Sequence, residues 1–394
     1  MDGKTNRSNV RSTLFLLVVT TSILLLRPPE LRSQGRDAAV DLLAELTNAH
    51  GVVGFEGEVR DILRREWGGL LTDLHTDGIG NLFGTLEGQS ESPRVLLMAH
   101  MDEVGFLVRY IDEDGFIYFN NVGGYFSQSV LTQRLSILTP NGPVLGYTGM
   151  KSGHILPREN RMTMVPLENM FIDVGARSRE EVEGMGIRPG LPITYATEFQ
   201  VLNGTSRYLA RAWDDRVGLA VIIEALRQLR NREHPNNVQV AATVQEEVGL
   251  RGASVVQAST RPDIVINLEI GIASDFPLLT SPTMSQEALG KGPGIFVFDG
   301  SMIPNNKYVD WIIQVAKENN IPYQFESVTG YGEDAAMLQK SAQGIPAVTI
   351  GIPTRYGHSQ SGVIDRADYD NTVKLVVAMI EKLSASEVES IRAF

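Results

Sequence analysis

The fold of this chain is decided by one stretch near its middle, Thr243-Val244-Gln245-Glu246-Glu247-Val248-Gly249-Leu250-Arg251-Gly252-Ala253-Ser254. The β-branched run at residues 238–244 predicts a buried parallel strand, and the two glycines lead into a predicted helix. Glu246 and Glu247 therefore stand at the carboxyl end of a strand, where ligands bind in open α/β sheets. Neighbouring side chains point in different directions there, so one glutamate can bind a metal ion while the other faces a water molecule. The alternative is that Glu246 and Glu247 lie in a solvated turn without a function, because charged pairs are common in loops.

Three further strand-like runs bring metal-binding side chains to strand ends. One run ends in His100 and Asp102, a second ends in Glu269, and a third is followed by His358. The spacing allows Asp102 to accept a hydrogen bond from the ring nitrogen of His100 that faces away from a metal, which fixes the tautomer. The alternative for His100 is a histidine that only caps a strand.

Acidic residues also stand at two predicted helix starts. Asp214 and Asp215 precede an amphipathic helix at 219–229, and the ordinary role of an acid there is an N-cap. A short carboxylate beside a helix start is also well shaped to bridge two cations from the floor of a cleft. Glu333 and Asp334 open a later helix, where the macrodipole favours acids, so capping is their predicted role.

Residues 104–207 differ in character from the rest of the chain. Short alternating strands are separated there by Gly, Pro and Asn turns, with little helical periodicity, which predicts an all-β insertion. The α/β pattern occupies 36–103 and 208–394 on either side. We therefore expect an α/β domain interrupted by an inserted β-domain.

Composition limits the possible partners and metal ligands. The 394 residues carry a formal net charge of −12, which argues against nucleic acid as a partner because such partners need a basic face. There are no cysteines and only six histidines, so a transition-metal site must use imidazole and carboxylate. Nitrogen and oxygen ligands without thiolate suit zinc, cobalt or manganese.

The first 35 residues resemble a leader rather than part of the fold. Basic residues precede the apolar run Leu14 to Leu26, which is short for a membrane span and typical of a secretory signal peptide. The prediction is export to the periplasm, with an uncleaved membrane anchor as the rival interpretation. A mis-assigned start codon is the third possibility, and it would leave the protein in the cytoplasm.

The strand ends and the helix start together offer His100, Asp214, Glu247, Glu269 and His358 at one predicted edge of a sheet. Five ligands are too many for one catalytic ion that keeps an open position, but they fit two divalent ions that share a bridging carboxylate. Glu246 is left over beside them, where a general base is expected.

The segments Ala99–Gly105, Asp214–Gly218, Gln245–Gly249 and Arg355–Ser359 resemble the tetrahedral (glutamyl) aminopeptidase family, which also holds proteins called endoglucanase M. The resemblance runs from about residue 38 to 383. It implies a catalytic domain built as a zinc-peptidase-like α/β/α sandwich with a mixed central sheet. It also implies an inserted β-domain that serves oligomerisation or substrate access, and a homo-oligomer such as a dodecamer.

The resemblance also implies a role for each site residue. His100 and Glu269 would hold one ion, Glu247 and His358 the other, and Asp214 would bridge them, with Glu246 as the base and Asp102 orienting His100. Glu269 departs from the family, which more often has Asp at this position, one methylene shorter.

The predicted function is that of a metal-dependent aminopeptidase, which removes N-terminal residues from peptides with a free amine by means of a two-metal-activated water and a Glu base. One alternative is a related metal-dependent deacylase of N-acyl amino acids. Another is a metal-binding scaffold without turnover. A cellulase is disfavoured, because glycosidases use two carboxylates that flank a sugar and need no metal pair.

Overall fold

The computed structural model describes residues 1, 3, 37–160, 162–277 and 287–393. The chain divides into two units, residues 1–37 and 38–394. The predicted leader lies outside the described residues except for Met1 and Gly3. Within the described residues, every helix is too short or too polar to cross a membrane.

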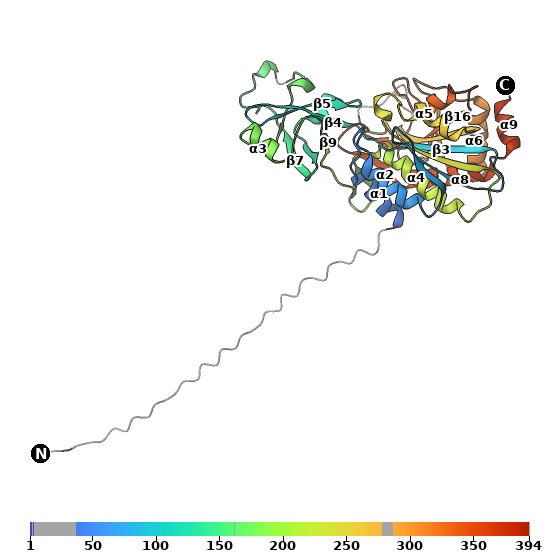
Figure 1. Ribbon diagram of the computed structural model, residues 1–394, viewed down its shortest axis with the longest axis horizontal. Coiled ribbons are helices and arrows are strands. Elements are labelled where there is room, and N and C mark those ends of the chain that lie inside the picture. The colour runs from blue at the N-terminus through green and yellow to red at the C-terminus, as the bar shows by residue number, and fades with distance from the viewer. Residues whose placement is uncertain (2, 4–36, 161, 278–286, 394) are drawn as a thin grey trace. The chain divides into compact units, whose positions relative to one another are not determined.

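A mixed sheet built from eleven of the described strands forms the α/β part of the chain (Figure 1). Nine of them follow one another in the order β1 (Thr72–Thr76), β2 (Leu82–Leu86), β12 (Asn237–Thr243), β3 (Arg94–His100), β13 (Ile264–Ile272), β16 (Ala347–Arg355), β17 (Gly362–Asp365), β11 (Arg207–Ala210) and β10 (Gln200–Val201). The remaining two are β14 (Gly294–Phe298), which pairs with β16, and β15 (Gln324–Ser327), which pairs with β14.

The four central strands, β12, β3, β13 and β16, are parallel to one another, so their carboxyl ends meet at one edge. Their register sets the level of each functional residue. Thr243 of β12 lies opposite His100 of β3, and Asn267 of β13 lies opposite Met98, two residues before His100. Glu269 therefore reaches the same level as His100, and the predicted convergence of strand ends follows from the pairing.

Helices cover both faces of this sheet, as the predicted α/β/α class requires. One face packs against α1 (Ala38–Asn48), α2 (Gly57–Trp67), α4 (Trp213–Leu229), α6 (Asn306–Glu318), α8 (Arg366–Lys382) and α9 (Ala385–Arg392). The other face packs against the short helices α5 (Ala253–Thr260) and α7 (Ala335–Gln339).

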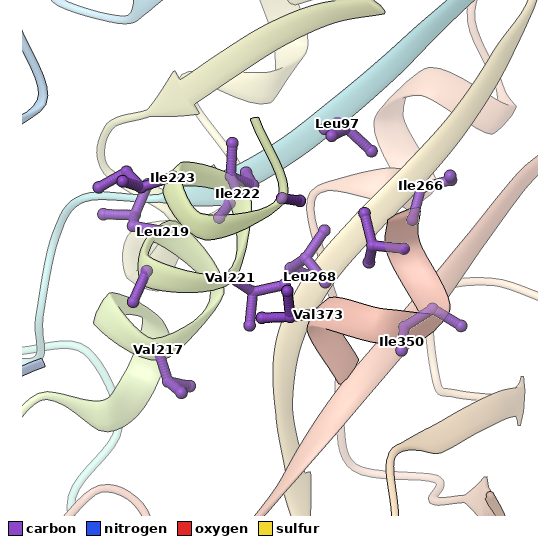
Figure 2. Close-up of a cluster of buried hydrophobic side chains, with 14 of the residues drawn as sticks. Leu97, Val217, Leu219, Val221, Ile222, Ile223, Ile266, Leu268, Ile350 and Val373 are labelled. Atoms are coloured by element: carbon purple, nitrogen blue, oxygen red, sulfur yellow. The ribbon is translucent and has the colours of Figure 1, made fainter. Parts of the chain in front are cut away.

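Strand β3 shows how the sequence directs this packing. Val95 and Leu97 pack on the α4 side, whereas Leu96 and Met98 pack on the α5 and α7 side, because successive side chains of a strand point to opposite faces. Figure 2 shows Leu97 together with residues of α4, including Ile222. A continuous apolar run is therefore expected for β3, since both of its faces are buried.

Six strands within the predicted insertion close into a separate β-barrel (Figure 1). Around the barrel they run β4 (Gly105–Ile111), β5 (Ile117–Val122), β8 (Ile172–Asp173), β7 (Gly142–Thr148), β6 (Arg134–Thr139) and β9 (Pro192–Tyr195), and α3 (Arg179–Gly184) lies in the same region. The hairpin of β10 and β11 instead joins the main sheet through β17. We therefore propose that the inserted domain ends before residue 200 rather than at 207.

A buried ion pair stands where the chain passes from the sheet into the barrel. The guanidinium of Arg211 donates to both carboxylate oxygens of Glu103, which also accepts from the hydroxyl of Thr194 in β9. The Arg216 guanidinium lies 3.5 Å from the same carboxylate. Burial would raise the pKa of Glu103, but the two arginines hold it below its usual value.

Replacing one partner of this pair is expected to destabilise the protein strongly. Arg211→Leu should lower the free energy of unfolding by about 3–5 kcal/mol, because it leaves a buried carboxylate with half of its counter-charge. Urea titration followed by circular dichroism measures the loss. Arg65→Leu, which breaks the exposed pair with Glu45, serves as the control and should cost below about 1 kcal/mol. Equal losses in the two variants would contradict the assignment.

Candidate active site

Asp214 lies between two histidines that are far apart in the sequence. Its Oδ1 is 2.9 Å from Nε2 of His100, and its Oδ2 is 3.0 Å from Nε2 of His358. One carboxylate therefore faces both imidazoles with separate oxygens, as a carboxylate that bridges two ions would.

The other ring nitrogen of each histidine is held by a main-chain carbonyl. Nδ1 of His100 lies 3.0 Å from the carbonyl oxygen of Asp102, and Nδ1 of His358 lies 3.0 Å from that of Gly124. A donor hydrogen on Nδ1 leaves Nε2 free to bind a metal. Both Nε2 atoms point to Asp214, so the two rings are oriented for a shared centre.

Two further carboxylates complete two groups of three ligands. Glu269 Oε2 lies 3.5 Å from His100 Nε2, and Glu247 Oε1 lies 3.3 Å from His358 Nε2. In each group, His100–Asp214–Glu269 and Asp214–Glu247–His358, the ligand atoms lie within 4.8 Å of one another. Asp214 belongs to both groups. The structure thus brings together all five residues that the sequence proposed as ligands.

The electrostatics of these groups favour bound cations. Burial raises the pKa of Glu269 to about 8. Burial lowers the pKa of His358, but the carboxylates of Glu247 and Asp214 more than offset this and raise it to about 11. Burial alone would raise the pKa of Asp214, as it does for Glu269. Hydrogen bonds from His100 and His358 instead hold the pKa of Asp214 well below its usual value. Carboxylates so close together need positive charge between them, and oxygen and nitrogen donors of this kind fit divalent zinc, cobalt or manganese.

Asp102 contacts both His100 and the backbone that carries the two glutamates. Its carboxylate Oδ1 lies 3.6 Å from Nδ1 of His100, at ion-pair distance, and its main-chain oxygen lies closer to the same nitrogen, at 3.0 Å. The carboxylate accepts from the amides of Glu246 at 3.0 Å and Glu247 at 3.2 Å. That the side chain of Asp102 orients His100 stays a prediction. The parallel pairing of β3 and β12 places the two amides next to the same carboxylate.

Glu246 lies at the same edge of the sheet and belongs to a third group of potential ligands, His100–Glu246–Glu247. Its side chain is buried, and burial raises its pKa well above the usual value. The backbone at Gln245 is left-handed with φ of 55°, and it turns the chain sharply after β12.

Of the acids at the two predicted helix starts, Asp215 makes a capping contact and Asp334 does not. Asp215 Oδ1 accepts from the amide of Gly218 at 3.0 Å, a capping contact, and Oδ2 accepts from the amide of His100 at 3.3 Å. The expected capping by Asp334 is wrong, because its side chain makes no cap bond and instead accepts from the hydroxyl of Thr243 at 2.5 Å. The start of α7 packs against the end of β12, which puts these two side chains in contact.

A pocket opens beside Asp214 and His358. Aromatic rings line much of it, among them those of Tyr125 and Tyr195 from the barrel and Trp213 from α4. The sequence did not identify Tyr125 or Gly124 as part of the site. Two adjacent glycines followed by an aromatic residue in a barrel loop were the available signal, but they gave no indication that the loop meets His358.

The sequence matches the family described as M42 glutamyl aminopeptidase over residues 80–375. The putative aminopeptidase FrvX of Escherichia coli (strain K12) is 35% identical over 356 residues, which are 90% of this chain and 98% of that protein. The TET aminopeptidase of Thaumarchaeota archaeon SCGC AB-539-E09 has a similar structure, with a TM-score of 0.86 and 39% identity over 90% of this chain and 100% of that one. The TET1 peptidase of Pyrococcus horikoshii can assemble into a tetrahedron or a large octahedral shell. Its structure has a TM-score of 0.79 and 31% sequence identity to this chain, over 88% of this chain and 100% of that one. This chain therefore belongs to the M42 glutamyl aminopeptidase family of metal-dependent peptidases.

Proposed function

We propose that the protein is a two-metal aminopeptidase in which Glu246 is the general base. The observation that carries the proposal is the pair of ligand groups that share Asp214. His100 and Glu269 would hold one ion, and Glu247 and His358 the other, with Asp214 bridging. When bound, such ions make a water molecule more acidic and polarise a carbonyl group.

Glu246 has the chemistry that a base in this position needs. Its amide is held by Asp102, so the backbone that carries it is fixed relative to the ligands. Its burial raises the pKa of the carboxyl group, which favours accepting a proton. Glu246 would take a proton from the attacking water and then give it to the leaving amine of the peptide.

The acidic surroundings also suit the substrate proposed here. A peptide with a free N-terminus carries an ammonium group, which carboxylates attract. Membership of a peptidase family does not favour the deacylase alternative, in which the substrate amine is acylated. Turnover of aminoacyl-anilides compared with N-acetylated amino acids separates the two activities, because only an aminopeptidase requires the free amine.

Removal of the metal is expected to abolish activity reversibly. Dialysis against a chelator should reduce peptide hydrolysis to background, and zinc, cobalt or manganese should restore it, because carboxylate and imidazole donors bind these ions. The measurement is the hydrolysis rate of a dipeptide with a free amine, and the control is mock dialysis. Full activity of protein shown by elemental analysis to be metal-free would contradict the proposal.

We also propose that the chain is a homo-oligomer, by analogy with the shells formed by the P. horikoshii TET1 peptidase. Light scattering on the purified protein tests this.

The basic and apolar pattern of residues 1–35 supports a further proposal, that they form an export leader. N-terminal sequencing of the mature protein tests the leader independently of the enzyme.

A further inference from the structure

A segment of the inserted barrel, residues 123–125, reaches the proposed metal ligands. The carbonyl oxygen of Gly124 lies 3.0 Å from Nδ1 of His358. A side chain added at Gly123 would come within 3.4 Å of Oε2 of Glu247. The barrel therefore borders the ligand group Asp214–Glu247–His358, and the next residue along, Tyr125, lines the pocket beside it.

The ring of Tyr125 is fixed by the barrel core. It stacks on Phe106 of β4 with ring centroids 4.7 Å apart and planes 18° apart, and it meets the ring of Tyr195 edge-on at 5.9 Å. The backbone before it is also held, because the side-chain amide of Asn121 donates to the carbonyl of Gly123 at 2.8 Å. A side chain held in this way cannot turn freely to find a partner for its hydroxyl group.

The hydroxyl of Tyr125 is buried and has no hydrogen-bond partner among the described residues. Leaving a buried hydroxyl unpaired destabilises the folded state, and such groups call for an explanation. Burial, together with Tyr195 and Glu103, raises the pKa of Tyr125 well above its usual value, so the hydroxyl keeps its hydrogen at neutral pH. A donor with no acceptor among the described residues thus belongs to a side chain that lines a pocket together with Asp214 and His358.

We infer that the hydroxyl of Tyr125 is a further catalytic group, which donates a hydrogen bond to the scissile carbonyl oxygen of the bound peptide. The inference rests on the proposed aminopeptidase function. The carbonyl oxygen gains negative charge as water attacks, and a donor already in place stabilises that charge without reorganisation. The hydroxyl keeps its proton throughout, and Glu246 remains the group that moves one.

The test is Tyr125→Phe, which keeps the ring on Phe106 and removes only the oxygen. We expect kcat for a free-amine dipeptide to fall on the order of 10- to 100-fold, because the donor acts mainly in the transition state. KM should change by less than about threefold for the same reason. Metal content by elemental analysis should equal that of the wild type, since the hydroxyl is not a ligand.

Two matched variants complete the experiment. Tyr110→Phe removes a hydroxyl from an exposed tyrosine near the other end of β4 and should leave kcat unchanged. Tyr195→Phe removes the hydroxyl of the other barrel tyrosine that lines the same pocket and should have the smaller effect of the two. A greater loss in Tyr195→Phe than in Tyr125→Phe would mean that the donor is misassigned.

The remaining outcomes separate this inference from the proposed function. Wild-type kcat in Tyr125→Phe, a change confined to KM, or a loss of metal would each overturn the role of the hydroxyl and leave the aminopeptidase proposal standing. Wild-type protein that holds two ions but cleaves no free-amine peptide would overturn the proposed function, and the inference with it.

Discussion

Glu246→Gln is expected to lose on the order of 10²-fold or more in kcat while the protein keeps its metal ions. The substitution preserves the size of the side chain but removes the group that accepts a proton. The amide of residue 246 still donates to Asp102, so the turn after β12 should be maintained. The measurement combines steady-state kinetics on a free-amine dipeptide with elemental analysis of the same sample.

The control for this variant is Glu91→Gln, which makes the same chemical change at an exposed position. It should leave both kcat and metal content unchanged. If Glu246→Gln kept near-full activity, the assignment of the base would be wrong. If it lost activity together with metal, Glu246 would be acting as a ligand in the group that it forms with His100 and Glu247.

Asp214→Asn is expected to have the largest effect on metal binding. Among the described residues, Asp214 alone belongs to both His100–Asp214–Glu269 and Asp214–Glu247–His358, so its charge serves both ions. Asn keeps one oxygen but carries no negative charge. We expect metal content to fall from about two ions per chain to below about one, and hydrolysis to fall at least as far as in Glu246→Gln.

His358→Asn provides the comparison, because His358 belongs to only one of the two groups. It should lose one ion and retain the other, which His100 and Glu269 would still hold. Isothermal titration of metal-free protein with zinc measures the number of sites in each variant. Identical site numbers in Asp214→Asn and the wild type would rule out a bridging role for Asp214.

The strand ends of this site were predictable because hydrophobic runs and polar ends carry a strong signal. Each run that led to His100 or Glu269 is a strand buried on both faces, and such strands read as continuous apolar segments. Glu247 and His358 follow strands of the same kind. Once the strands are parallel neighbours, their carboxyl ends must meet, so His100, Glu247 and Glu269 are expected at one edge of the sheet. Asp214 comes from the start of α4 and His358 from the loop after β16.

The contacts that support the ligands were not predictable, because they depend on the register between distant strands. The carboxylate of Asp102 faces the amides of Glu246 and Glu247 only because β3 pairs with β12 in that register. Asp334 follows the same principle, since the strand end beside it offers the hydroxyl of Thr243, and the Asp334 carboxylate accepts from this hydroxyl instead of capping α7. Local patterns cannot distinguish these outcomes from solvent-facing acids.

The contact of the barrel loop with the site could not be predicted from the sequence for a related reason. Alternating strands and turns predict a β-domain, but they do not say which of its loops lies against the sheet. The contact between Gly124 and His358 joins residues 234 positions apart. Tyr125 therefore becomes a candidate only when its unpaired hydroxyl and the shared pocket are seen together.

Anomalous diffraction from crystals of the zinc-loaded protein, collected at the zinc absorption edge, tests the proposed metal centre most directly. We predict two peaks per chain, one beside His100 and Glu269 and the other beside Glu247 and His358, both in contact with Asp214. A single peak away from Asp214, or zinc bound only elsewhere on the molecule, would contradict the two-metal centre on which the proposed hydrolysis depends.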